Sequence, residues 1–270
     1  MALNESMSIL ESVLLGFIQG VSEFLPVSSS GHLAVARNLM GFGDIPILFD
    51  VLMHVPTLAA ISIVFRKRIT ELLVSLSRGI RRKNGPEDRN NLRLLGVICI
   101  ATVCTAIVGF ALAKIEDHFV MTPKVISVLF LFTAAILVLS SLFKGSKQYG
   151  DIGIKEGVIT GIAQGIGVLP GISRSGITIS ASLSTGMSRE RAGEYSFLIS
   201  IPAILGAVAY KIGDIEALAI DPLVLAAGLL TSFVVGLLSL LLLLQIVKRG
   251  RLYFFSFYLV PLGILTLLFI

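Results

Sequence analysis

Residues 16–31 read GFIQGVSEFLPVSSSG, and residues 161–176 read GIAQGIGVLPGISRSG. A single offset of 145 residues superposes the two stretches. It aligns these pairs: Gln19 with Gln164, Gly20 with Gly165, Ser28 with Ser173, Ser30 with Ser175, and Gly31 with Gly176. A second pair of segments, FDVLMHVPTLAA from Phe49 and YSFLISIPAILGA from Tyr195, matches at an offset of 146. Two matches at nearly equal offsets indicate an internal duplication.

The composition around these repeats is that of an integral membrane protein. Of the 270 residues, 55% are hydrophobic and only 14% are charged, whereas soluble domains carry about 25% charged residues. Too few polar side chains remain to cover a globule in water. Residues 1–12 contain Glu5 and Glu11 but no basic residue, so we expect no cleavable signal peptide at this end.

Hydrophobic stretches recur along the whole chain, and most are long enough to span a bilayer. Six are expected to be transmembrane helices: 50–65, 94–113, 124–143, 195–211, 222–243 and 252–270. Residues 69–82 resemble an amphipathic helix lying on the membrane surface.

Pro, Gly and Ser break two further apolar regions, 8–42 and 156–188. Each break predicts a re-entrant helix–loop–helix, because irregular backbone at membrane depth must be buried in protein or line a wet cavity. The predicted fold is therefore an all-α polytopic membrane protein with a single domain, 1–270. Its two repeats, about 8–143 and 156–270, each hold one re-entrant segment and three crossings. Three is odd, so the second repeat should be inverted relative to the first.

The basic residues support this inversion. Placing residues 66–93 in the cytoplasm puts 17 Lys and Arg residues inside and four outside, as the positive-inside rule requires. The net charge of +5 thus reflects membrane orientation and contacts with anionic lipid headgroups, and it does not indicate nucleic acid. The two re-entrant loops should enter from opposite faces and meet near the middle of the bilayer.

Ionisable residues at membrane depth indicate a functional site, because burying charge in lipid is costly. The two loops hold eight polar residues: Glu23, Ser28, Ser29, Ser30, His32, Ser173, Arg174 and Ser175. Free N–H groups at a helix start attract an anion, and the guanidinium of Arg174 is suited to phosphate oxygens. A phosphate site is therefore predicted where the loops meet, with His32 available as base or nucleophile.

Each of these residues also has a structural interpretation. The serines are ordinary helix N-caps, Glu23 could pair with Arg174, and His32 could hydrogen-bond between helices. Gln19 and Gln164 are expected to make interhelical hydrogen bonds. We interpret His54 and His118 as structural, because no acidic or serine-rich segment surrounds them. It is the joint occurrence of these groups in two broken helices that favours a phosphate site.

The loops also resemble known signature segments. EFLPVSSSGHL, from Glu23, and PGISRSGITIS, from Pro170, are similar to the signatures of the undecaprenyl-diphosphate phosphatase family, also called the bacitracin-resistance protein family. The chain length, the repeats and SRERAGEYSFLISIP, from Ser188, are similar too. The resemblance covers essentially the whole chain.

This resemblance implies hydrolysis of undecaprenyl diphosphate to undecaprenyl phosphate and inorganic phosphate, which recycles the lipid carrier for peptidoglycan synthesis. It places the protein in the bacterial cytoplasmic membrane, with the active site facing the extracytoplasmic side. It also implies a divalent cation, Mg²⁺ or Ca²⁺, held by Glu23. The family's pair of acidic residues maps onto Gln19 and Glu23, so a metal scheme that needs two carboxylates from this motif is not met here.

The family's serine, histidine and arginine map onto Ser29, His32 and Arg174. In the mechanism we expect, Arg174 and the helix starts hold the diphosphate, and Ser29 or a water attacks the terminal phosphorus. His32 acts as base and then acid, or is itself the nucleophile. The expected substrate-binding residues are Ser28, Ser30, Ser173, Ser175, Gly176 and Gln19.

Two other interpretations remain open, a transporter and a purely structural membrane protein, although the latter would not need Arg174 and Glu23 in broken segments. A transporter or flippase for a phosphorylated lipid would also use inverted repeats and broken helices that meet at the midplane. The proximity of His32 to serines favours the enzyme, because substrate binding alone does not require it. The expected partners are undecaprenyl diphosphate and membrane lipids, and the sequence is compatible with a homodimer.

The inverted topology predicts opposite locations for two parts of the chain. Reporter fusions should place residues 70–90 in the cytoplasm and the C-terminal Ile270 outside. Activity of both fusions on the same side of the membrane would contradict the inverted repeat.

Overall fold

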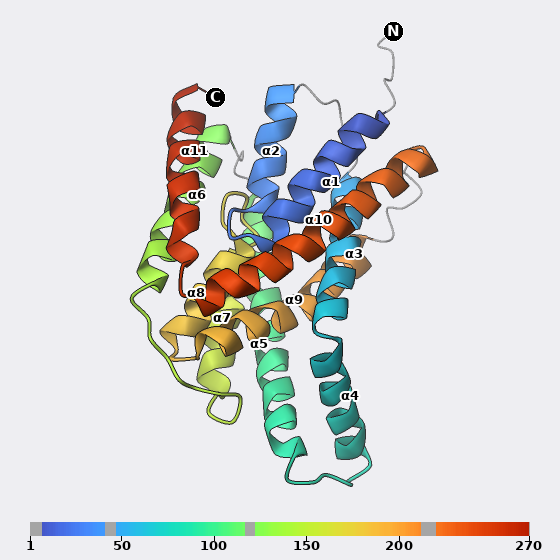
Figure 1. The fold of residues 1–270 in the computed structure, drawn as a ribbon, viewed down its shortest axis with the longest axis vertical. Helices are drawn as coiled ribbons and strands as arrows, with labels where there is room; N and C mark the ends of the chain where they lie inside the picture. The colour runs from blue at the N-terminus through green and yellow to red at the C-terminus, as the bar shows by residue number, and fades with distance from the viewer. Residues whose placement is uncertain (1–6, 41–46, 117–121, 212–219, 270) are drawn as a thin grey trace.

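The computed structural model describes residues 7–40, 47–116, 122–211 and 220–269, which form α-helices and no strand. Figure 1 shows the helices packed as one bundle. They are α1 (Ile9–Phe24), α2 (Ser29–Met40), α3 (Ile47–Val64), α4 (Arg66–Ile80), α5 (Asp88–Glu116), α6 (Pro123–Ser140), α7 (Ile154–Ile166), α8 (Arg174–Ser184), α9 (Arg189–Lys211), α10 (Pro222–Lys248) and α11 (Ser256–Phe269). The predicted all-α class is confirmed for this part of the chain.

Five helices in the described ranges are long and apolar enough to cross a membrane: α5, α6, α9, α10 and the segment Leu252–Phe269 that contains α11. The sixth expected crossing, α3, contributes a shorter apolar stretch, Val51–Val64. The protein is therefore a multi-pass membrane protein. The opposite orientation of its two halves, the re-entrant path of the broken segments, and the repeat boundaries stay predictions.

Both broken regions form helix–loop–helix units. Phe24 ends α1 and Ser29 begins α2, and the second unit breaks between Ile166 of α7 and Arg174 of α8. The first break contains Pro26, which has no N–H to donate to a helix. Leu25, directly before it, has an extended backbone, as the residue before a proline commonly does. The sequence therefore places both helix interruptions within a few residues of where they occur.

Small residues bring the helices of these units close to their neighbours. Gly16 and Gly20 of α1 lie against the backbone of α10 at Gly228 and Ser232, so closely that a Cβ atom would clash. A glycine at every fourth position lets two helix backbones approach, as is common between membrane helices.

The second unit repeats this packing on another partner. Gly161 and Gly165 of α7 lie against α5, where Ala101 and Val108 fill the space that a Cβ atom would need. The two glycine pairs are 145 residues apart in the sequence. Equivalent positions of the two repeats therefore have the same role in helix packing.

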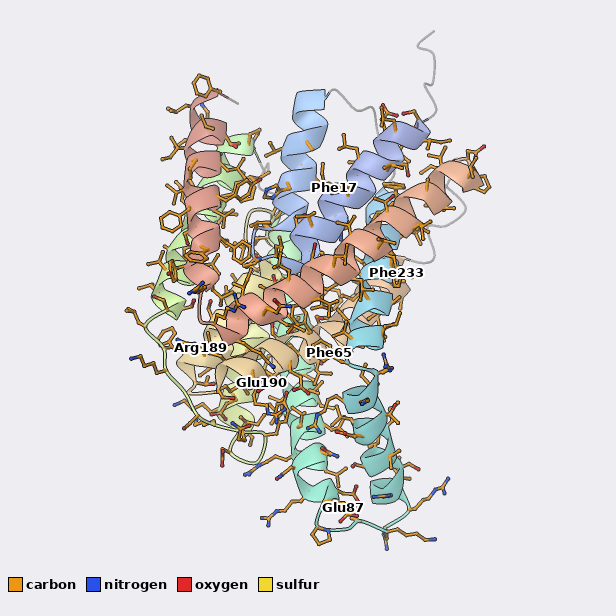
Figure 2. All side chains as sticks on the ribbon, viewed as in Figure 1. Phe17, Phe65, Glu87, Arg189, Glu190 and Phe233 are labelled. Carbon is orange, nitrogen blue, oxygen red and sulfur yellow. The ribbon has the colours of Figure 1, made fainter. Side chains whose placement is uncertain are left out.

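Residues 69–82 are largely helical, and their expected position on the membrane surface stays a prediction. They lie mostly in α4, which packs lengthwise beside the beginning of α5, with Glu87 at the tip of this pair (Figures 1 and 2). Ser75 donates a hydrogen bond to Asp88 at 2.7 Å and accepts one from Asn91 at 2.9 Å. The 29 residues of α5 span about 43 Å, longer than the roughly 30 Å core of a bilayer. This polar pairing and the length of α5 explain a hairpin that extends beyond the apolar bundle.

Replacement of one contact glycine should destabilise the bundle more than replacement of an open one. In Gly161→Ala, the new Cβ would lie 2.5 Å from the Ala101 carbonyl oxygen, which should cost about 1–3 kcal/mol. The control is Gly96→Ala in α5, where no atom lies within 4 Å of the added Cβ and helix propensity should gain about 0.5–1 kcal/mol. Thermal unfolding in detergent, followed by circular dichroism, measures both. Equal shifts in the melting temperature would contradict the packing role of Gly161.

Candidate active site

The two broken segments meet through the side chain of Ser28. Its hydroxyl oxygen accepts a hydrogen bond from the backbone N–H of Gly171 at 3.0 Å and another from that of Gly31 at 3.3 Å. Thr133 of α6 supports the second loop, since its hydroxyl donates to the Gly171 carbonyl at 2.9 Å and accepts from the Ser173 N–H at 3.2 Å. Two loops separated by about half the chain are thus joined at one point.

Ser28 also has a left-handed backbone, with φ of 73°. This conformation is uncommon for a residue other than glycine and often occurs at functional sites. It turns the chain so that the next residue, Ser29, begins α2 beside the end of α1. The sequence predicted a loop at Ser28 but not its left-handed backbone. Serine is common at helix starts as an ordinary N-cap, so its presence there does not indicate an unusual conformation.

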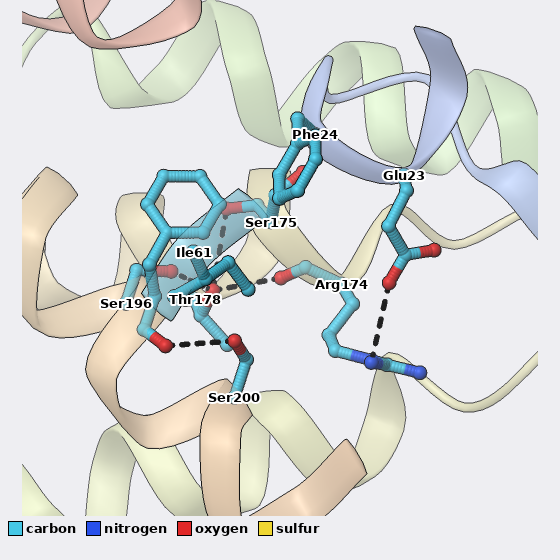
Figure 3. Close-up of a pocket in the computed structure, with 9 residues that line it drawn as sticks. Glu23, Phe24, Ile61, Arg174, Ser175, Thr178, Ser196 and Ser200 are labelled. Carbon is cyan, nitrogen blue, oxygen red and sulfur yellow. Dashed lines mark hydrogen bonds and ion pairs between the residues drawn. The ribbon is translucent and has the colours of Figure 1, made fainter. Parts of the chain in front are cut away.

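Glu23, near the end of α1, lies at the centre of the site and its side chain is only 8% exposed. Its Oε2 accepts hydrogen bonds from the Ser29 hydroxyl at 2.7 Å and from the Gln19 amide at 3.1 Å. Its Oε1 lies 3.5 Å from the guanidinium of Arg174, and a dashed line in Figure 3 marks this ion pair. Ser29 and Arg174 therefore bind the same carboxylate, one from each broken segment.

Arg174 is the first residue of α8, and the helix start around it is capped by Ser173. The Ser173 hydroxyl accepts from the Gly176 N–H at 3.1 Å and lies 3.2 Å from the Ser175 hydroxyl. A permanent positive charge at a helix N-terminus adds to free N–H groups that already favour an anion. Arg174 is 29% exposed, so part of its guanidinium remains open to a ligand.

A small cavity of about 20 Å³ lies beside Arg174. Figure 3 shows residues from α1, α3, α8 and α9 around it. They are Glu23, Phe24, Ile61, Arg174, Ser175, Thr178, Ser196, Phe197 and Ser200. The sequence analysis missed the hydroxyl residues Thr178, Ser196 and Ser200. Two of them lie within SRERAGEYSFLISIP, so that segment carried a usable signal.

The His32 side chain does not reach Ser29 in this structure. Its Nδ1 lies 2.8 Å from the Ser28 carbonyl oxygen, and its Nε2 lies 2.8 Å from the Tyr258 hydroxyl of α11. A carbonyl can only accept, so Nδ1 carries a proton and Nε2 of the neutral ring accepts from Tyr258. The ring also stacks on Tyr258, with centroids 5.6 Å apart. The role of His32 as base or nucleophile stays a prediction.

His54 of α3, which the sequence analysis interpreted as structural, contacts the candidate site. Its Nε2 lies 3.5 Å from Glu23 Oε2, and its side chain is 25% exposed. The sequence gave no sign of this contact, because His54 lies in an ordinary apolar helix, outside the broken segments. His118 lies outside the described residues.

The remaining predicted residues are divided between the site and its surroundings. Gln19 is fully buried, and its Oε1 has no hydrogen-bond partner. Ser30 is exposed, and none of the side-chain hydrogen bonds between described residues involves it. Within the described ranges, no group of three or more His, Cys, Asp or Glu residues could hold a metal ion. Any cation would therefore depend on Glu23, on neutral oxygens such as Gln19 Oε1, and on the ligand's own oxygens.

Comparison with known proteins shows the family of the chain. Residues 12–265 match the family model described as Bacitracin resistance protein BacA. The chain is 47% identical to the undecaprenyl-diphosphatase of Treponema denticola over 260 residues, which cover 96% of each chain. It is 38% identical to that of Borrelia recurrentis, over 94% of this chain and 96% of the relative. It is also 38% identical to that of Korarchaeum cryptofilum, over 97% and 99% respectively. The chain therefore belongs to the Bacitracin resistance protein BacA family.

Proposed function

We propose that this protein is an undecaprenyl-diphosphatase, which hydrolyses undecaprenyl diphosphate to undecaprenyl phosphate and inorganic phosphate. The observation that carries the proposal is the joint binding of one buried carboxylate by Ser29 and Arg174. A hydroxyl that donates its proton to Glu23 is positioned to become a nucleophile. The guanidinium beside it is suited to the phosphate that this nucleophile would attack.

The reaction that fits this geometry is a displacement at the terminal phosphorus. The Ser29 oxygen forms a bond to that phosphorus while its proton passes to Glu23 Oε2. The bond from phosphorus to the bridging oxygen breaks, and undecaprenyl phosphate leaves with the bonding electrons. Glu23 releases that proton to the departing phosphate. Water then attacks the phosphorus of the phosphoserine and gives a proton to Glu23, while the bond from phosphorus to the Ser29 oxygen breaks and this oxygen recovers a proton from Glu23. Direct attack by water, with Ser29 only orienting it, uses the same residues.

Arg174 stabilises the charge that develops on the phosphoryl oxygens. The N-terminal N–H groups of α8 and the hydroxyls of Ser173 and Ser175 complete a set of donors around it, and such preorganised donors are typically the largest contribution to catalysis. His32 contributes indirectly, because its Nδ1–H holds the Ser28 carbonyl at the loop junction. In this assignment Glu23 takes the role of base that the sequence analysis gave to His32.

A divalent cation, Mg²⁺ or Ca²⁺, is compatible with this arrangement. Glu23 supplies one carboxylate, and the unpartnered Oε1 of Gln19 supplies a neutral oxygen one helical turn away. Mg²⁺ commonly binds through one or two carboxylates together with substrate phosphates. When bound, the ion would offset the negative charge of the diphosphate.

The substrate tail stays in the lipid, so only the headgroup must enter the site. We assign the enzyme to the cytoplasmic membrane, with the site reached from the extracytoplasmic side. The charge distribution and the family support this location. Ser29, Glu23 and Arg174 all come from one chain, so the proposed chemistry does not depend on a homodimer.

Replacement of Arg174 tests the proposed activity. Purified protein in detergent should release inorganic phosphate from undecaprenyl diphosphate. Arg174→Lys keeps the charge but loses the planar fork, so kcat should fall about 10²-fold, as for loss of one oxyanion donor. The matched control is Arg191→Lys, at a site that pairs with Glu194 away from the cavity. Full activity of Arg174→Lys would refute the role assigned to Arg174, whereas no phosphate release by the parent protein would refute the proposed activity.

The cation proposal is tested at Gln19. Gln19→Leu removes the amide oxygen, so half-maximal activity should need about tenfold more Mg²⁺, with recovery at saturation. Gln19→Glu should be active and need no more Mg²⁺ than the parent. A Mg²⁺ titration of phosphate release measures both, and identical titration curves for all three proteins would exclude Gln19 as a ligand.

A further inference from the structure

The environment of Glu23 contains a histidine that the two signature segments do not supply. His54 lies in α3, and its Nε2 is 3.5 Å from Glu23 Oε2. The other donors come from α1, α2 and α8, that is from Gln19, Ser29 and Arg174. Among the described residues, His54 is thus the one outside the broken segments whose side chain contacts Glu23.

The donors divide between the two oxygens of Glu23. Ser29, Gln19 and His54 all lie on Oε2, whereas Arg174 lies on Oε1. This division matters because a guanidinium fork readily binds both oxygens of one carboxylate. If the Glu23 carboxylate rotated to bind Arg174 with both oxygens, Oε2 would no longer accept the hydrogen bond from the Ser29 hydroxyl. This rotation would also occupy the donors that a phosphate needs.

Gln19 and His54 oppose this rotation of the carboxylate, and they differ in how firmly they are held. Gln19 is on the same helix as Glu23, so it moves with it. His54 belongs to a separate helix that is held to α10 next to the histidine. The Met53 carbonyl accepts from the Ser232 hydroxyl of α10 at 3.3 Å. Within α3 itself, the buried Thr57 hydroxyl donates to the His54 carbonyl at 2.8 Å.

We propose that His54 is a positioning residue, whose Nε2–H holds the Glu23 carboxylate toward Ser29 and away from a bidentate pair with Arg174. The role rests on the proposed hydrolysis and adds a residue to it. His54 does not touch the substrate in this role. It determines which oxygen of Glu23 faces the nucleophile and keeps the guanidinium of Arg174 available to phosphate.

The test replaces His54 with Gln or with Asn, whose side-chain amides extend to different distances from the backbone. The amide nitrogen of glutamine lies about where Nε2 of histidine lies, whereas that of asparagine lies near Nδ1 and cannot reach Glu23. His54→Gln should therefore retain kcat within about threefold. His54→Asn should lose about 10- to 100-fold in kcat with little change in KM, as misplacement by about 1 Å does. Phosphate release from undecaprenyl diphosphate and the melting temperature in detergent are measured for both variants and the parent.

Both amides are polar and small, so similar melting temperatures are expected. Parent-like activity of His54→Asn would overturn the proposal. An equal loss in both variants at unchanged melting temperature would also overturn it, because the imidazole itself would then be required. An inactive parent would refute the hydrolase function, which separates that failure from failure of the positioning role.

Discussion

The structure depends on one constraint, which is that the buried carboxylate of Glu23 must be satisfied inside an apolar bundle. Loss of one partner from a buried ion pair costs roughly 3–5 kcal/mol. Here the partners come from four helices, α1, α2, α3 and α8. They can surround one carboxylate only if both broken segments end at the same depth. The helix breaks, the loop contact at Ser28 and the close glycine packing all serve this requirement.

The two repeats share a scaffold but divide the chemistry. An offset of 145 residues aligns Gly16 with Gly161, and both glycines pack a helix closely against a partner. The same offset aligns Ser29 with Arg174, the first residues of α2 and α8. These two positions contact the same carboxylate, one through a hydroxyl and one through a guanidinium. Glu23 itself aligns with Val168, so the carboxylate is present in one repeat only. An internal duplication can thus build an asymmetric site from two equivalent helix starts.

The sequence predicted what depends on local signals and missed what depends on tertiary contacts. The breaks near Pro26 and Pro170, the serine-capped helix starts and the meeting of Ser29 with Arg174 followed from motifs and from the repeat. His54 could not be found in this way, because nothing in its own helix distinguishes it from a packing residue. The position of His32 was equally hidden, since it depends on Tyr258, 226 residues away. The hairpin of α4 and α5 depends on Ser75, Asp88 and Asn91, which no amphipathic pattern reveals.

The carboxylate also separates a hydrolase from a transporter. A pocket that only binds phosphate needs donors, and a negative charge inside it opposes the ligand. Glu23 therefore weakens a pure binding site. In a hydrolase the same group is useful, because it accepts the proton that Ser29 must lose as it attacks. The 2.7 Å contact between the Ser29 hydroxyl and Glu23 is the arrangement that such proton transfer requires. A site that places a base on a hydroxyl and a guanidinium beside them is built to break a phosphate bond, and this favours the enzyme over the carrier.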